Sequence, residues 1–139
     1  MTKYTLNLED DFDFDIIGLC SHQADYRVCW SINEQIGLRL KKSIEPFMVS
    51  GKKGVVNSSH SLYEFEDEDE SIAYYLIQNK SNGKFLVPEK AQIDFFLVIK
   101  EAGAVDVEGF LAKLKEIQSV LTAFSFDPCD LKSANKFIF

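Results

Sequence analysis

The sequence has few of the residues on which disulfide-held or metal-held folds depend. Among its 139 residues there are three cysteines and two histidines. Cys20, Cys29 and Cys129 are odd in number and have no paired spacing, which argues against a disulfide framework. No apolar run is long enough to cross a bilayer, and the first eleven residues lack the apolar centre of a secretory signal. We therefore expect a cytoplasmic protein, and the sequence predicts no cofactor.

Basic residues are outnumbered by acidic ones, and the net charge is −7. Residues 1–70 hold 14 acidic and 7 basic side chains, whereas residues 71–139 hold 8 of each. A nucleic acid or an anionic membrane surface is bound through clustered Lys and Arg, so we expect neither as a partner. Hydrophobic residues are plentiful at 46%, with 12 Phe and 5 Tyr. Together with the length, they predict one domain, residues 1–139, with an aromatic-rich core.

The first third of the chain predicts a strand followed by two helices. Apolar and polar residues alternate over 4–8, as they do in a half-buried strand. Aspartates at positions 10 and 11 can cap a helix that continues to about position 20. Apolar residues at helical spacing predict a second helix over 21–36, with Ser21 as its cap and Gly37 as its left-handed stop.

The remainder predicts a mainly antiparallel sheet and one more helix. Asn82-Gly83 is a strong signal for a type I′ hairpin. Asp106 precedes a helical apolar stripe that reaches Leu121. The expected fold class is α+β: about five strands in a mainly antiparallel sheet, with an N-terminal helix pair and a C-terminal helix packed on it. The expected strands lie at 38–44, 62–65, 72–79, 84–87, 93–99 and 122–126.

Two acidic runs, 9–15 and 64–70, have part of the pattern of a calcium loop: aspartates stand at its first, third and fifth positions in the first run, and at its first and third positions in the second. In both runs isoleucine occupies the sixth position, where a glycine is needed for the turn, and neither has a glutamate at the twelfth. We expect a helix N-terminus at the first run and a solvated hairpin turn at the second. The sequence predicts no metal site.

Cys20, His22 and Cys29 are the residues that could form a zinc site or a nucleophilic pair. Their spacing fits no structural zinc pattern, and a fourth ligand would have to be Asp25 or the distant third cysteine. Ser21, His22 and Asp25 have triad-type side chains without a nucleophile turn around them. We expect Cys29 to be a small core residue, and we find no conventional catalytic signature.

Two carboxylates, Glu89 and Asp94, flank the entry to the most hydrophobic strand. Pro88 cannot donate a ladder hydrogen bond, so a turn is expected between the two acids. One hypothesis is structural: each carboxylate accepts backbone N–H groups that the turn leaves unpaired. The alternative is a cation-binding or small-molecule-binding site, conceivably of an enzyme, formed by Glu89 and Asp94 with Arg27.

The same stretch resembles a known family motif. Residues 87–96 read Val-Pro-Glu-Lys-Ala-Gln-Ile-Asp-Phe-Phe. They are similar to the pattern that names the IPExxxVDY family of small bacterial proteins, with Phe95 in place of the tyrosine. The stretch 22–30, with Asn33, also looks like the N-terminal part of that family. The resemblance implies a small cytoplasmic bacterial protein and brings no reaction with it.

The absence of a catalytic signature and the abundance of aromatic residues favour a non-catalytic interaction domain. We expect its partner to be another protein or a second copy of the chain. Aromatic residues and arginine supply most of the binding energy at protein interfaces. The interface residues that the sequence suggests are Trp30, Tyr26, Phe137 and Phe139, together with Arg27.

Overall fold

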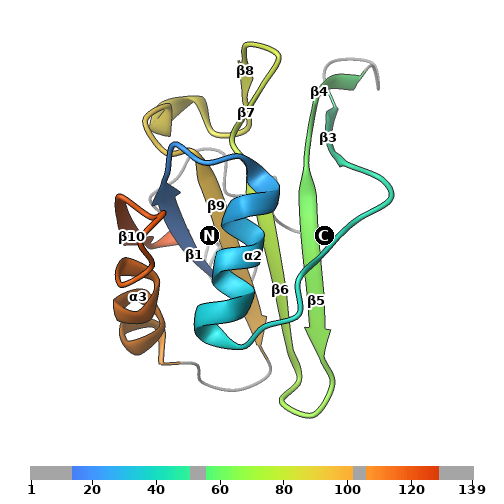
Figure 1. Cartoon of the computed structure of the whole chain (residues 1–139). Helices are drawn as coiled ribbons and strands as arrows, with labels where there is room; N and C mark the ends of the chain where they lie inside the picture. Colours follow the sequence, from blue (N-terminus) through green and yellow to red (C-terminus); the bar gives the residue numbers. More distant parts are fainter. Residues whose placement is uncertain (1–13, 51–55, 102–105, 129–139) are drawn as a thin grey trace, which may run out of the picture.

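A six-stranded antiparallel sheet with two helices on one face forms the centre of the protein (Figure 1). The computed structural model describes residues 14–50, 56–101 and 106–128. The spatial order of the strands is β10-β1-β9-β6-β5-β2, and every neighbouring pair is antiparallel. The strands are β1 (Phe14–Cys20), β2 (Lys41–Lys42), β5 (Leu62–Asp67), β6 (Ile72–Gln78), β9 (Phe95–Glu101) and β10 (Thr122–Phe126).

Smaller elements surround this sheet. Two hairpins flank it, and a single 3-10 turn follows the second of them. None of the described helices is long and apolar enough to cross a membrane. The helices are α2 (Asp25–Ile36) and α3 (Val107–Lys115), the hairpins pair β3 (Phe47–Ser50) with β4 (Val56–His60) and β7 (Lys80–Ser81) with β8 (Lys84–Phe85), and the 3-10 turn is η2 (Pro88–Lys90).

The α+β class is confirmed, but the expected N-terminal helix pair is wrong. Phe14–Cys20, the described part of the first expected helix, is strand β1. This strand lies between β9 and β10 and is buried on both faces, so its apolar residues do not alternate with polar ones. A short run that is apolar on every side fits a helix or a covered strand equally well. The pairing partners, distant in sequence, decide between the two.

The second expected helix is present but shorter. It begins at Asp25, and the residue at its N-cap position is Ala24. Ser21 has another role, because its Oγ donates to the Ser119 carbonyl at 2.6 Å and accepts from the Gln23 N–H. At the other end, Gly37 has φ +87° and its N–H bonds to a carbonyl of the helix, which confirms the left-handed stop.

Most other expected elements are confirmed, with different ends. The Asn82-Gly83 hairpin has positive φ at both residues, as a type I′ turn requires. Helix α3 ends at Lys115 rather than Leu121. The strand expected over 38–44 is reduced to the two residues of β2. The strand expected at 4–8 and the apolar tail at Phe137 and Phe139 lie outside the described residues.

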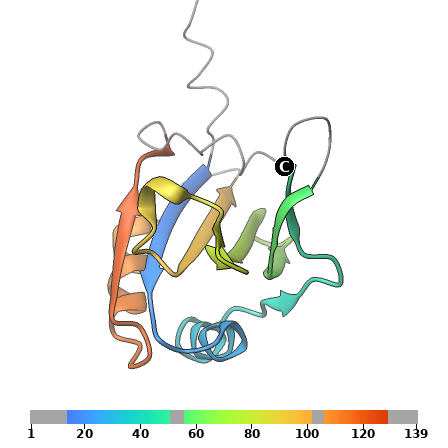
Figure 2. The same ribbon diagram turned by 90° about the horizontal axis from the view of Figure 1, so that it is seen from above.

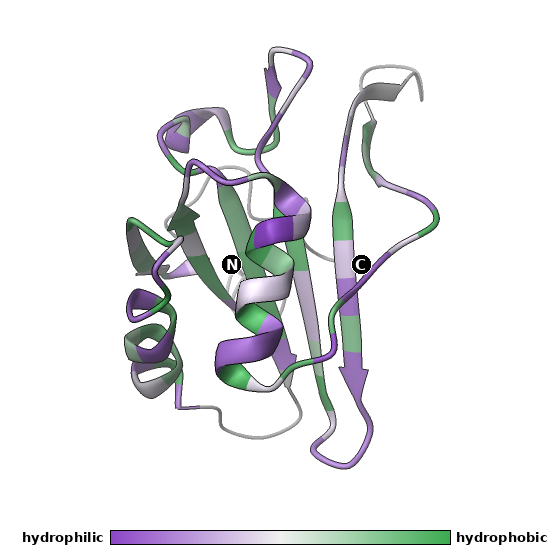
Figure 3. Cartoon of the chain, in the orientation of Figure 1, coloured by the Kyte–Doolittle hydropathy of each residue, from purple (hydrophilic) through white to green (hydrophobic). Residues whose placement is uncertain are grey.

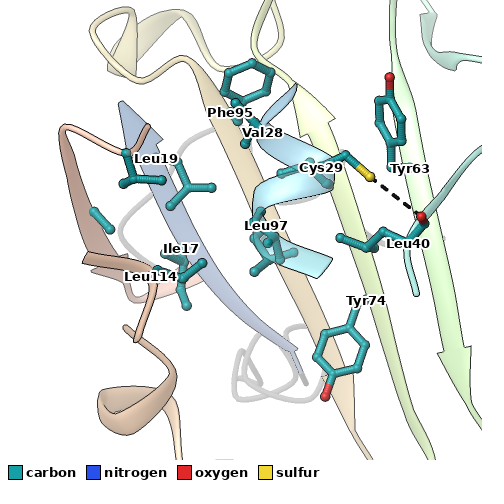
Figure 4. Close-up of a cluster of buried hydrophobic side chains, with 14 of the residues drawn as sticks. Ile17, Leu19, Val28, Cys29, Leu40, Tyr63, Tyr74, Phe95, Leu97 and Leu114 are labelled. Atoms are coloured by element: carbon teal, nitrogen blue, oxygen red, sulfur yellow. Dashed lines mark hydrogen bonds between the residues drawn. The ribbon is translucent and has the colours of Figure 1, made fainter. Parts of the chain in front are cut away.

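Two apolar clusters cover the two faces of the sheet. The first packs Val28 and Ile32 of α2 and Leu114 of α3 against the inward side chains of the central strands. Figure 2 shows the helices from above, and Figure 4 shows Val28 and Leu114 in this cluster. The second, on the opposite face, includes Leu86, Val87 and Ile93 from the connection between β8 and β9. The central strand β9 contributes to both clusters and is among the most hydrophobic elements (Figure 3).

Candidate functional site

The segment 86–94, which contains most of the motif at 87–96, is held in place by the side chain of Asn79. This asparagine is fully buried at the end of β6. Its Oδ1 accepts the Val87 N–H at 2.8 Å, and its Nδ2 donates to the carbonyls of Lys90 at 3.1 Å and Ile93 at 2.8 Å. One side chain thus supplies hydrogen-bond partners for three backbone groups of the segment.

Asp94 accepts a backbone N–H, but this N–H belongs to Ser21 after β1 and not to the turn between the two acids, as the structural hypothesis had it. Its Oδ2 accepts the Ser21 N–H at 2.9 Å and ties the end of β1 to the start of β9 across 73 residues of sequence. The Asp94 backbone is also paired, since its N–H donates to Leu19 and its carbonyl accepts from Asn79. Glu89, by contrast, is exposed on η2. The motif therefore serves the fold at Asp94, and a ligand role for Glu89 and Asp94 stays a prediction.

The two cysteines within the described residues, Cys20 and Cys29, have neither a reactive nor a metal-binding environment. Cys29 belongs to the helix-covered core, where its thiol lies 3.6 Å from the Leu40 carbonyl (Figure 4). Burial, and then the charge of Asp25, raises the pKa of the Cys29 thiol to about 11. Burial and then the charge of Asp94 raise the pKa of Cys20. A raised pKa disfavours the thiolate that nucleophilic or metal chemistry requires, and no metal-binding group of three His, Cys, Asp or Glu occurs in the described ranges.

The second acidic run forms the turn of the β5–β6 hairpin, as predicted. Asp67 Oδ1 accepts the Glu70 N–H at 3.2 Å, and Ser71 has the positive φ that a tight turn requires. The carboxylates of Glu68 and Glu70 are exposed. The first run lies partly in β1, where Asp15 pairs opposite Ile99.

A Ser–His pair that sequence reasoning missed lies on β4. Ser58 Oγ and His60 Nε2 are 2.8 Å apart, and both residues are buried. The two residues are two positions apart on one strand, so both side chains point to the same face. The sequence signal is the i, i+2 spacing of Ser58 and His60 in the Ser-Ser-His-Ser run. This spacing indicates a shared face only once the run is known to be a strand.

The outer face of α2 carries the exposed aromatic residues. Tyr26 is 64% exposed and Trp30 is 60% exposed, one helical turn apart. Arg27 lies between them and is also exposed. The opposite face of the helix buries Val28, Cys29 and Ile32 in the core. The fold therefore places three of the sequence-suggested interface residues on one surface.

Beside these residues lies a groove of about 610 Å³ between α2 and the turn that leads from α3 to β10. A hydrogen bond of 3.3 Å from Ser119 Oγ to Ser31 Oγ joins its two walls. Buried residues of α2 and α3 belong to one apolar cluster, which fixes the two helices relative to each other. The groove is lined by Gln23, Arg27, Trp30, Ser31, Glu34, Gln35, Ile117, Gln118 and Ser119. We call these residues, together with Tyr26, the α2 surface.

The chain matches no protein-family model and no curated protein.

Proposed function

We propose that this protein is a non-catalytic interaction domain of the cytoplasm that binds a protein partner through the α2 surface. The observation that carries the proposal is the exposure of Trp30 at the rim of the groove. Burial of an exposed indole by a partner is favourable, and Trp, Tyr and Arg are the commonest hot-spot residues. The free thiols of Cys20 and Cys29 fit a reducing compartment.

The lining of the groove defines the chemistry of the partner. Ile117, nearly buried, provides an apolar floor, while Gln and Ser side chains supply hydrogen-bonding groups along the walls. Arg27 can donate to a carboxylate or carbonyl oxygen of the partner. The groove therefore suits a segment with one apolar side chain and a neighbouring acceptor, rather than a flat apolar surface.

The test begins with affinity capture of a partner from an extract of the source organism, followed by reconstitution from purified proteins. Trp30→Ala is expected to weaken the reconstituted complex by about 2 kcal/mol, roughly 30-fold, as hot-spot truncation does. Met48, an exposed apolar residue of β3 outside the α2 surface, provides a matched control as Met48→Ala. Equal binding by wild type and Trp30→Ala would refute the proposal.

The alternative from the sequence is a cation or small molecule held by Glu89 and Asp94. Native mass spectrometry of the purified protein tests it directly. A bound ligand that is lost in both Glu89→Gln and Asp94→Asn would favour this alternative over the interaction domain.

A further inference from the structure

Among the described residues, β10 is the last strand at one end of the six-stranded sheet. On one side its five residues pair with β1, from Ile16 opposite Phe126 to Cys20 opposite Thr122. On the other side no strand pairs with it within 14–50, 56–101 and 106–128. An edge strand presents backbone N–H and C=O groups that another strand can use.

The sequence of β10 has none of the features that usually protect such an edge. Thr122-Ala-Phe-Ser-Phe126 contains no charged residue and no proline, and its pairing with β1 has no register shift. Phe124 is 46% exposed, and Leu121, just before the strand, is 59% exposed. Natural edge strands normally carry lysine, proline, a bulge or a short length to prevent pairing with other chains.

The opposite end of the sheet does have such protection. Its last strand, β2, has only two residues, and both are exposed lysines. The neighbouring strand β5 carries exposed Glu64 and Glu66. Self-pairing at this end would bring like charges together, which is unfavourable across strands. The two ends therefore differ, and β10 is the end suited to association.

We propose that two copies of the chain associate through antiparallel pairing of their β10 strands, which joins the two sheets into one. Pairing over all five residues is two-fold symmetric, so Phe124 lies opposite Phe124 of the second copy, and Thr122 lies opposite Phe126. Within one copy, Phe124 and Phe126 have ring centroids 6.4 Å apart, and Phe126 and Phe96 have the same separation. The pairing extends this aromatic row across the axis.

Charge favours a second copy as the occupant even though each chain carries a net charge of −7. The acidic hairpin belongs to β5 and β6, and β5 lies four strands from β10. At about 4.8 Å per strand, the two acidic hairpins of the dimer are separated by seven spacings between their β6 strands and nine between their β5 strands, roughly 34–43 Å. This exceeds the Debye length of about 8 Å at physiological salt, so their repulsion is screened. The uncharged strands meet without like-charge contacts.

The β10 edge is separate from the α2 surface, so the two proposals can fail independently. Trp30→Lys should weaken partner binding and leave self-association unchanged. Phe124→Lys should do the reverse, because it places two lysines next to each other on the symmetry axis.

The experiment is analytical ultracentrifugation of the full chain over a range of concentrations. We expect a species of twice the 15.8 kDa chain mass, and at least about a tenfold weaker association for Phe124→Lys, since like charges directly opposite destabilise strand pairs. Trp30→Lys, which places the same new charge at another exposed aromatic residue, is the control. A monomer at all concentrations would overturn the proposal, as would a Phe124→Lys dimer as strong as wild type.

A second variant keeps the test decisive if Phe124→Lys does not fold. In Phe124→Cys, antiparallel pairing brings the Cα atoms of the two introduced cysteines within the separation of about 4.4–6.8 Å that a disulfide spans. Peptide mapping after mild oxidation should identify a link between the two copies of residue 124. A dimer linked elsewhere, or no intermolecular link, would contradict pairing through β10.

Discussion

Replacing Asn79 by alanine is expected to destabilise the protein more than any substitution of an exposed side chain. The change removes three hydrogen bonds, to Val87 N–H and to the carbonyls of Lys90 and Ile93. The bonds to Val87 and Ile93 are buried, so their backbone partners lose hydrogen bonding without gaining water. At about 1–3 kcal/mol for each buried group and about 1 kcal/mol for the third bond, the loss is about 3–7 kcal/mol.

Urea unfolding followed by far-ultraviolet circular dichroism measures this loss. Gln35→Ala, at an exposed position of α2, is the control and should change the free energy of unfolding by less than about 0.5 kcal/mol. Hydrogen exchange supplies a local readout, because the Val87 amide should lose its protection in Asn79→Ala. A loss of less than about 1 kcal/mol would refute the reasoning, since it would mean that the turn finds other hydrogen-bond partners.

Asn79→Asp sharpens the test through its dependence on pH. The carboxylate can still accept the Val87 N–H, but its second oxygen then faces the carbonyls of Lys90 and Ile93. Burial and these carbonyls should raise the pKa of the introduced carboxyl above its unfolded value. The folded state then holds the proton more tightly, so stability relative to wild type should increase as pH falls from 7 toward 4. A difference that is constant with pH would contradict the assigned geometry.

Three further predictions concern Asp94, Gly18 and Cys29. Asp94→Ala should cost about 1–2 kcal/mol because Ser21 N–H loses its acceptor, whereas Asp94→Asn keeps an acceptor and should cost less than about 0.5 kcal/mol in the same unfolding assay. Gly18→Ala should cost about 1–3 kcal/mol, since a Cβ there would lie 3.0 Å from Ile93 Cγ2, and a near-wild-type melting temperature would contradict this. The pKa of the Cys29 thiol is about 11 in the folded protein and 9.0 in the unfolded chain. The folded state therefore holds this proton more tightly, and the free energy of unfolding should fall between pH 9 and 11. Cys29→Ala should show a smaller fall.

Local sequence patterns predicted much of the fold correctly. The Asn82-Gly83 hairpin follows from the positive φ that these residues adopt easily. The stop of α2 at Gly37 has the same cause. The continuous apolar run of β9 indicated a covered strand, and it is a central strand of the sheet. These features depend on residues close together in the chain, so the sequence contains the physical information that determines them.

The candidate site was only partly predictable for a related reason. Trp30, Tyr26 and Arg27 were suggested by residue type, and helical periodicity explains why they share a face once α2 is known to be a helix. The groove beside them also requires the turn at Ile117 and Ser119, about 90 residues further along the chain. No local pattern relates those two segments.

By itself the sequence determined the fold class, the Asn82-Gly83 hairpin, the end of α2 at Gly37 and the apolar character of the central strands. Only the tertiary structure decided that residues 14–20 form a strand, that Asn79 holds the turn at 86–94, and that β10 ends the sheet. The first depends on a partner distant in sequence, since Ile17 of β1 pairs with Leu97 of β9, 80 residues further along the chain, and the Asn79 bonds span 8 to 14 residues, which is beyond the reach of local periodicity. Backbone preference and side-chain periodicity act over a few residues, whereas burial and hydrogen-bond pairing are completed only when the chain folds.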